Sequence, residues 1–203
     1  MKIFGPAIFA AMLTCISPAG AETPHAGEEV QQEAGIVPRY LLMDYRGRAV
    51  TNEDFPGSFQ LISFGYTFCP DVCPTTLSKM SLIMEKLGKQ ADRLQPLFIT
   101  VDPERDTPEV LHRYIAFFNP RIIGLTGSPE LVRRAADNFK VKYEKYLEPG
   151  AAPNRYAVDH SVGMYLLGPD GRFLARFAYG MPFGEMAERI RALMEEYREE
   201  PAK

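Results

Sequence analysis

The sequence predicts an α/β fold in which helices flank a mixed β-sheet. Two dense apolar runs, residues 59–66 and 94–101, have the composition of buried central strands. A segment with apolar residues at helical spacing follows the first run, and a helix-start signal follows the second. Later, two strand-like segments flank residues 168–171, Gly-Pro-Asp-Gly, which is typical of a hairpin turn. This order indicates a layered sheet with helices on its faces.

The first elements after the amino-terminal region are a small hairpin, a central strand and a helix. Residues 39–44 and 48–51 flank Tyr-Arg-Gly, which suits a hairpin. The buried strand over residues 59–66 is followed by a helix over residues 74–91, with apolar side chains close to helical spacing. Pro74 fits the first helical position, because proline has no backbone N–H to lose there.

Two further helices are predicted by a hydroxyl residue placed before a proline. Thr107 and Ser128 suit the N-cap, and the proline after each suits the first helical turn. The remaining predicted elements are a strand at 94–101, a short strand at 121–125, a hairpin of 162–167 with 172–179, and a final helix over 183–198.

The amino-terminal residues 1–21 read as a secretory signal peptide. One early lysine precedes an apolar run over residues 3–16, and Ala-Gly-Ala at residues 19–21 is a suitable cleavage site. The apolar run is shorter than the ~20 residues of a membrane span. We therefore expect an exported, periplasmic protein that begins at Glu22. A membrane-anchored protein is the alternative if the segment is not cleaved.

The rest of the chain is predicted to form one domain. Residues 22–34 are polar and aperiodic, which indicates a flexible lead-in, and residues 35–200 form the folded domain. The whole chain carries a formal net charge of −3, with basic and acidic residues interspersed. This charge pattern argues against a nucleic-acid partner. We expect a monomer.

Cys69 and Cys73 lie where the strand-like run ends and the helix begins, in the sequence Phe-Cys-Pro-Asp-Val-Cys-Pro. Two thiols four positions apart can form a disulfide or hold a soft metal ion. The helix dipole at this point is expected to favour a thiolate at Cys73. Loss of the leader would remove Cys15 and leave the pair alone in a compartment that permits disulfides. The alternative to a functional pair is a purely structural disulfide.

The element order, with thiols at the first strand–helix junction, resembles the thioredoxin fold. Three local sequences resemble the Sco/SenC family of extracytoplasmic copper proteins: Thr-Phe-Cys-Pro-Asp-Val-Cys-Pro at residues 67–74, Val-Asp-Pro-Glu-Arg-Asp-Thr-Pro at residues 101–108, and Val-Asp-His-Ser at residues 158–161. This resemblance implies that Cys69, Cys73 and His160 bind one copper ion, Cu(I) or Cu(II).

The same resemblance implies a metallochaperone for the dinuclear copper centre of cytochrome c oxidase. Its implied partners are the copper-receiving oxidase subunit, which is expected to be a membrane-bound client, and other copper chaperones or thiol–disulfide reductases. Residue chemistry agrees, because Cu(I) prefers thiolates and imidazole suits either copper oxidation state.

Four carboxylates near these sequences have expected supporting roles. Asp71 lies between the cysteines and would favour a bound cation. Asp102 and Asp106 are expected to hold the loop after the second long strand. Asp159 could orient His160 by a hydrogen bond.

Other functions of a paired-cysteine protein fit this sequence less well than copper binding. In a thiol–disulfide oxidoreductase Cys69 would attack and Cys73 would resolve, but such enzymes usually have two intervening residues and need no histidine. Whether reductase activity accompanies copper binding stays open. The peroxiredoxin motif is absent around both cysteines. Three ligands suit structural zinc poorly. His25 and His112 are expected to be solvated.

Overall fold

The computed structural model describes residues 1, 36–147, 149–150, 152 and 155–199. The predicted leader after Met1 and the predicted lead-in therefore lie outside the described residues. Within the described part of the chain, no helix is long and apolar enough to cross a membrane.

The centre of the fold is a five-stranded mixed sheet in the order β5-β4-β3-β8-β9. β3 pairs in parallel with β4, which pairs in parallel with β5. On its other side β3 pairs antiparallel with β8, and β8 with β9. This is the predicted mixed sheet, and every predicted strand is present. The strands are β3 Phe59–Gly65, β4 Leu94–Thr100, β5 Ile123–Leu125, β8 Met164–Leu167 and β9 Phe173–Phe177.

The four α-helices found in the described residues match the predicted ones, with one shift at the start of the first. The hydroxyls of Thr107 and Ser128 accept backbone N–H bonds as N-caps, as predicted. The first helix begins at Val72, so Pro74 occupies its third position and not its first. A short 3₁₀ helix, η1, extends it over Gly88–Arg93. The helices are α1 Val72–Leu87, α2 Pro108–Ala116, α3 Pro129–Asn138 and α4 Phe183–Glu199.

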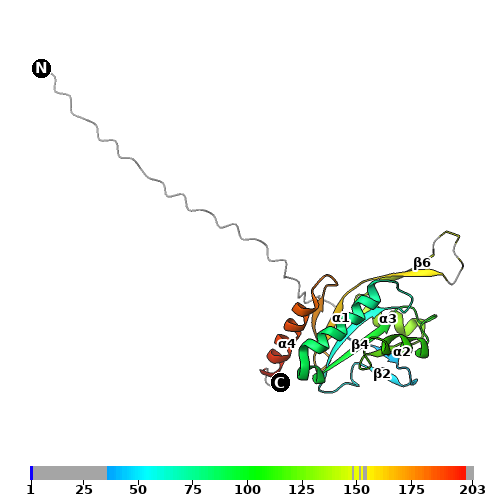
Figure 1. The fold of residues 1–203 in the computed structure, drawn as a ribbon, viewed down its shortest axis with the longest axis horizontal. Helices are drawn as coiled ribbons and strands as arrows, with labels where there is room; N and C mark the ends of the chain where they lie inside the picture. Colours follow the sequence, from blue (N-terminus) through cyan, green and yellow to red (C-terminus); the bar gives the residue numbers. More distant parts are fainter. Residues whose placement is uncertain (2–35, 148, 151, 153–154, 200–203) are drawn as a thin grey trace.

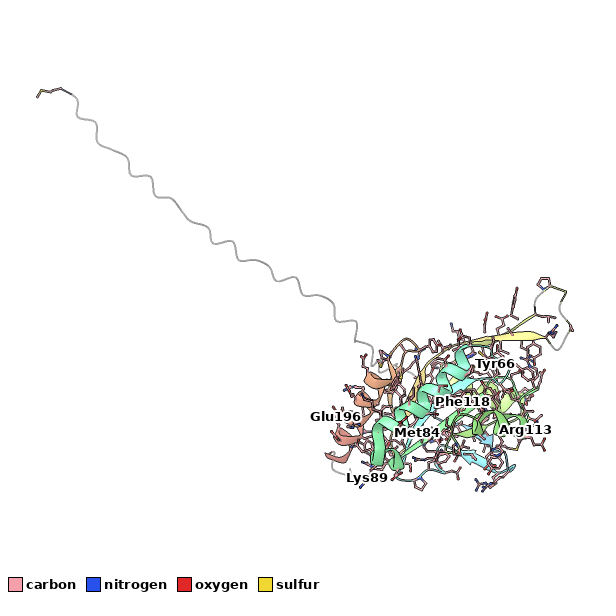
Figure 2. The ribbon with its side chains drawn as sticks, in the orientation of Figure 1. Tyr66, Met84, Lys89, Arg113, Phe118 and Glu196 are labelled. Atoms are coloured by element: carbon pink, nitrogen blue, oxygen red, sulfur yellow. The ribbon has the colours of Figure 1, made fainter. Side chains whose placement is uncertain are left out.

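The helices cover both faces of the sheet. α1 and α4 lie side by side on one face (Figure 1). α1 carries the buried Met84, labelled in Figure 2, into the core together with the buried Met80. α2 lies on this same face, because a Cβ on Gly124 of β5 would meet Leu111 of α2. On the opposite face, the Phe64 ring of β3 packs against Phe139 at the end of α3.

In the part of the chain that the structure describes, two hairpins lie outside the central sheet. The predicted first hairpin is formed by β1, Leu41–Met43, and β2, Ala49–Thr51. The second is formed by β6, Tyr143–Leu147, and β7, Tyr156–His160, and we call it the arm. The arm projects from the body of the molecule (Figure 1). Sequence analysis missed it because β6 is largely exposed on both faces and lacks an apolar stripe.

Candidate metal centre

Cys69 and Cys73 lie at the junction between the central strand β3 and the helix α1. Cys69 is half-buried in the turn that follows β3, and its N–H donates to the carbonyl of Tyr66 at 3.3 Å. Cys73 is in the first turn of α1 and only 1 % exposed. Both are free thiols. Gly65 makes room for Cys73, because a Cβ at that position would lie 2.7 Å from the Cys73 Sγ.

The arm brings His160 to the cysteine pair. His160 is the last residue of β7, and its Nε2 lies 3.7 Å from the Cys73 Sγ across 87 positions of sequence. The possible ligand atoms of Cys69, Cys73 and His160 all lie within 4.8 Å of one another. Among the described residues this is the one group of histidine, cysteine and acidic side chains arranged to hold a metal ion. The structure thus brings together all three residues singled out from the sequence.

A backbone carbonyl sets the orientation of the His160 ring. The His160 Nδ1 lies 3.0 Å from the carbonyl oxygen of Ser161. Because a carbonyl only accepts, the proton is on Nδ1, and Nε2 presents its lone pair toward Cys73. The expectation that Asp159 fills this role is therefore wrong. The carboxylate acts on the ring only through its charge.

The protonation states of His160 and Cys73 follow mainly from burial. Burial lowers the pKa of His160, although the Ser161 carbonyl and the Asp159 charge oppose this, so the ring is neutral at neutral pH. Burial also raises the pKa of the Cys73 thiol, against the effect of the Tyr66 N–H. The prediction of a thiolate at Cys73 is therefore wrong for the metal-free protein. A metal ion must displace the thiol proton to bind there.

Tyr66 connects the central strand to the arm. Its hydroxyl accepts a hydrogen bond from the Val158 N–H at 3.2 Å, and its ring is nearly perpendicular to the His160 ring, with centroids 6.0 Å apart. Figure 2 shows Tyr66 at the end of α1, near the base of the arm. Sequence analysis missed this residue. The available signal was a tyrosine three positions before Cys69, at the end of a buried strand.

Asp106 holds the turn that leads to Cys69, which confirms its expected structural role. Its buried carboxylate accepts hydrogen bonds from the Thr67 N–H at 3.1 Å, the Thr67 hydroxyl at 2.6 Å and the Thr100 hydroxyl at 2.6 Å. Burial raises the pKa of Asp106, while these bonds work in the opposite direction. The carboxylate thereby ties the turn to the end of β4.

Asp102 also has the structural role expected of it, through two residues that sequence analysis missed. The buried Asp102 pairs with Arg105 and accepts a hydrogen bond from the Tyr156 hydroxyl at 2.7 Å. Arg105 donates to the Tyr156 carbonyl at 2.9 Å, and its guanidinium lies 4.7 Å from the centre of the Phe68 ring. The group links the loop after β4, the turn before Cys69 and the arm.

The other residues considered from the sequence do not belong to the group formed by Cys69, Cys73 and His160. Asp71 is exposed at the N-cap of α1 and makes no side-chain cap hydrogen bond. His112 is exposed and stacks on Tyr45, with ring centroids 3.8 Å apart. His25 lies outside the described residues.

Beside His160 is an open surface hollow of about 400 Å³, lined by Lys142, Tyr143, Glu144, Asp159, His160 and Ser161.

A protein-family model described as SCO1/SenC matches residues 28–195 of this chain. The chain belongs to the SCO1/SenC family. The mitochondrial SCO2 homologue of Homo sapiens is 38 % identical over 173 residues, which cover 84 % of this chain and 64 % of that protein. The mitochondrial SCO1 homologue of Homo sapiens is 40 % identical over 161 residues, which cover 78 % of this chain and 53 % of that protein. The chain thus spans less than two thirds of these relatives.

Solved structures of SCO1/SenC relatives share the fold. Copper-bound ScoI of Arabidopsis thaliana matches with a TM-score of 0.74 and 34 % identity, over 80 % of this chain and 99 % of that one. Copper-bound yeast Sco1 matches with a TM-score of 0.71 and 34 % identity, over 81 % of this chain and 94 % of that one. BsSco is described as a member of the Sco family of cytochrome c oxidase assembly proteins. It matches with a TM-score of 0.60 and 23 % identity, over 77 % of this chain and 92 % of that one, and supports the fold alone. The predicted family and thioredoxin-like fold are confirmed.

Proposed function

We propose that this SCO1/SenC protein is a metallochaperone that binds one copper ion through Cys69, Cys73 and His160. The observation that carries the proposal is the convergence of two sulfur atoms and one imidazole nitrogen within 4.8 Å. Two thiolates and an imidazole suit both Cu(I) and Cu(II), whereas a structural zinc ion would need a fourth ligand. The copper-bound relatives support the same metal for this chain.

The differing burial of the ligands suits a cargo ion that must be taken up and released. Cys73 is almost fully buried, whereas Cys69 is half-buried and an open hollow lies beside His160. An incoming ligand from a partner can therefore reach the metal from the side of Cys69 and His160. Cys73 is then the last sulfur to release the ion.

We place this activity in the assembly of the dinuclear copper centre of cytochrome c oxidase. Membership of the SCO1/SenC family supports that placement. The client would be the copper-receiving, membrane-bound oxidase subunit, and other copper chaperones would supply the ion. The protein would be exported to the periplasm, or anchored in the membrane if its leader is retained. Because a disulfide offers no thiolate, a thiol–disulfide reductase partner would keep the pair able to bind metal.

A second candidate activity is thiol–disulfide exchange with client cysteines. It is favoured by the half-buried Cys69 with the buried Cys73 close behind it. The Cys69 thiolate would attack a client disulfide, and Cys73 would then displace the client sulfur. The client disulfide is reduced to two thiols by two electrons, and the Cys69–Cys73 pair is oxidised to a disulfide.

Titration of the reduced protein with Cu(I) in competition with a chelator tests the first proposal. Wild type should bind one ion tightly. His160→Ala should bind on the order of tenfold or more weakly, since even an outer partner of a ligand has effects of that size. His112→Ala removes an exposed histidine outside the site and should match wild type. Equal affinity in wild type and His160→Ala would remove His160 from the centre.

A disulfide-reduction assay on the same variants separates the two activities. His160→Ala retains both thiols, so it should still cycle between reduced and oxidised states. A fast rate on generic disulfides, together with no tight copper binding, would favour the reductase and contradict the chaperone.

A further inference from the structure

The Tyr114 hydroxyl is a buried polar group that forms no hydrogen bond with the described residues of the metal-free protein. Its oxygen is fully buried and has no hydrogen-bond partner among the described residues. A buried hydroxyl that forms no hydrogen bond costs free energy relative to its state in water. Such groups are rare in folded proteins, and a functional explanation is warranted where one lies beside a reactive site.

The topology places Tyr114 beside the first turns of α1. α1 follows β3 and α2 follows β4; these strands are parallel and both helices lie on one face, so the helices run in the same direction. The Ser81 hydroxyl donates to the Phe118 carbonyl at 3.4 Å, which joins α1 to the end of α2. Tyr114 lies one turn before Phe118, with ring centroids 5.3 Å apart. It is therefore about one turn nearer to Cys73 than Ser81 is.

Electrostatics agree with this placement. Burial raises the pKa of Tyr114, and ionisation of Cys73, or to a lesser extent of Cys69, would raise it further. The phenol therefore keeps its proton and can only act as a donor toward these sulfur atoms. The nearby Asp106 carboxylate already accepts hydrogen bonds from Thr67 and Thr100.

We propose that the Tyr114 hydroxyl donates a hydrogen bond to the Cys73 thiolate when copper is bound. A neutral thiol is a weak acceptor, whereas an ionised sulfur is a strong one, so the bond forms only after the metal displaces the Cys73 proton to solvent. Tyr114 keeps its own proton throughout. This inference rests on the proposed copper function and makes Tyr114 a positioning residue that favours the loaded state.

The test compares Tyr114→Phe with a matched variant, Tyr40→Phe. Tyr40 is also buried, but its hydroxyl donates to the Gln60 side chain at 2.8 Å. Tyr114→Phe should reduce Cu(I) affinity by about tenfold or more, since a hydrogen bond to a charged group is lost. Its metal-free form should unfold at the same temperature as wild type or higher. Tyr40→Phe should show the reverse: a lower unfolding temperature and unchanged copper affinity.

The absorption spectrum of the Cu(II)-loaded protein provides a second readout. A hydrogen bond to sulfur lowers the energy of its electrons, so its loss should move the sulfur-to-copper charge-transfer band to longer wavelength. We expect this shift in Tyr114→Phe and not in Tyr40→Phe.

Two results would overturn the inference while leaving the copper function intact. One is unchanged affinity and an unchanged band in Tyr114→Phe. The other is a metal-free Tyr114→Phe protein that unfolds at a lower temperature, as Tyr40→Phe should, because the hydroxyl would then have a partner before copper binds. Absence of tight copper binding by wild type would instead reject the proposed function, and this inference with it.

Discussion

The guanidinium carbon of Arg105 lies 3.6 Å from the centre of the Tyr156 ring. Tyr156 begins β7, the strand that ends at His160, whereas Arg105 belongs to the loop after β4. The same guanidinium lies over the ring of Phe68, which precedes Cys69 in the chain. One side chain therefore connects the turn that carries a thiol to the arm that carries the imidazole.

Replacement of Arg105 by alanine should destabilise the protein and weaken copper binding. Asp102 would remain buried without its cation, at a cost of about 3–5 kcal/mol. The arm would also lose the contacts that position His160. Urea unfolding and Cu(I) competition measure the two effects.

Arg133→Ala is the matched control, because Arg133 lies 3.6 Å from the Tyr143 ring on the same arm and its hydrogen bond to Tyr143 is exposed. Its loss should cost about 1 kcal/mol or less. Equal losses of stability in the two variants would contradict the role given to Arg105.

Gly65→Ala should damage the metal centre through crowding. The new methyl group would lie 2.7 Å from the Cys73 Sγ and 2.7 Å from Phe98, so the sulfur must move. Gly124→Ala crowds Leu111 and Ile115 in the same layer, away from the ligand group. Both variants should lose roughly 1–3 kcal/mol of stability. Only Gly65→Ala should bind Cu(I) more weakly than wild type. Equal Cu(I) affinity in Gly65→Ala and wild type would show that the exact position of the Cys73 sulfur is not critical.

The acid stability of the protein should depend on Asp44. Burial would raise the pKa of its carboxyl, but hydrogen bonds from Arg48 and Arg46, with the Arg48 charge, outweigh burial and hold the pKa below its usual value. Its stabilising contribution is therefore complete above the unfolded pKa of ~3.9 and is lost as pH falls through the lower folded pKa.

Asp44→Asn should consequently be less stable than wild type at neutral pH, and the difference should shrink as pH falls below about 4. Urea unfolding at a series of pH values measures this. Asp92→Asn, which removes a carboxylate from an exposed ion pair, is the control and should cost about 1 kcal/mol or less at neutral pH. A constant difference between Asp44→Asn and wild type at all pH values would contradict the assignment.

The leader should be removed on export. Cleavage after the Ala-Gly-Ala sequence at residues 19–21 would give a protein that begins at Glu22. The intact mass of protein recovered from the exporting cell distinguishes the cleaved chain from the full one. A full-length chain in the membrane fraction would show that the segment is an anchor.

The sequence by itself determined the order of the strands of the central sheet and of the four α-helices along the chain, and the position of the thiol pair. These features follow from local signals: apolar spacing sets the strands and α1, and a hydroxyl before a proline starts α2 and α3. The three residues that converge at the proposed metal centre were also singled out from the sequence, but His160 only through the family resemblance. No local rule places a residue 87 positions away beside Cys73.

Only the tertiary structure decided the chemical state of that site. The helix dipole, a local effect of about 0.3–1 kcal/mol, favours a thiolate at Cys73, but burial by distant segments is stronger and keeps the thiol protonated. The Ser161 carbonyl, not Asp159, orients His160. Arg105 contacts Tyr156 because the tertiary structure places the first residue of β7 beside the loop after β4. Burial and cross-chain contacts depend on segments far apart in sequence, and for that reason local patterns did not reveal them.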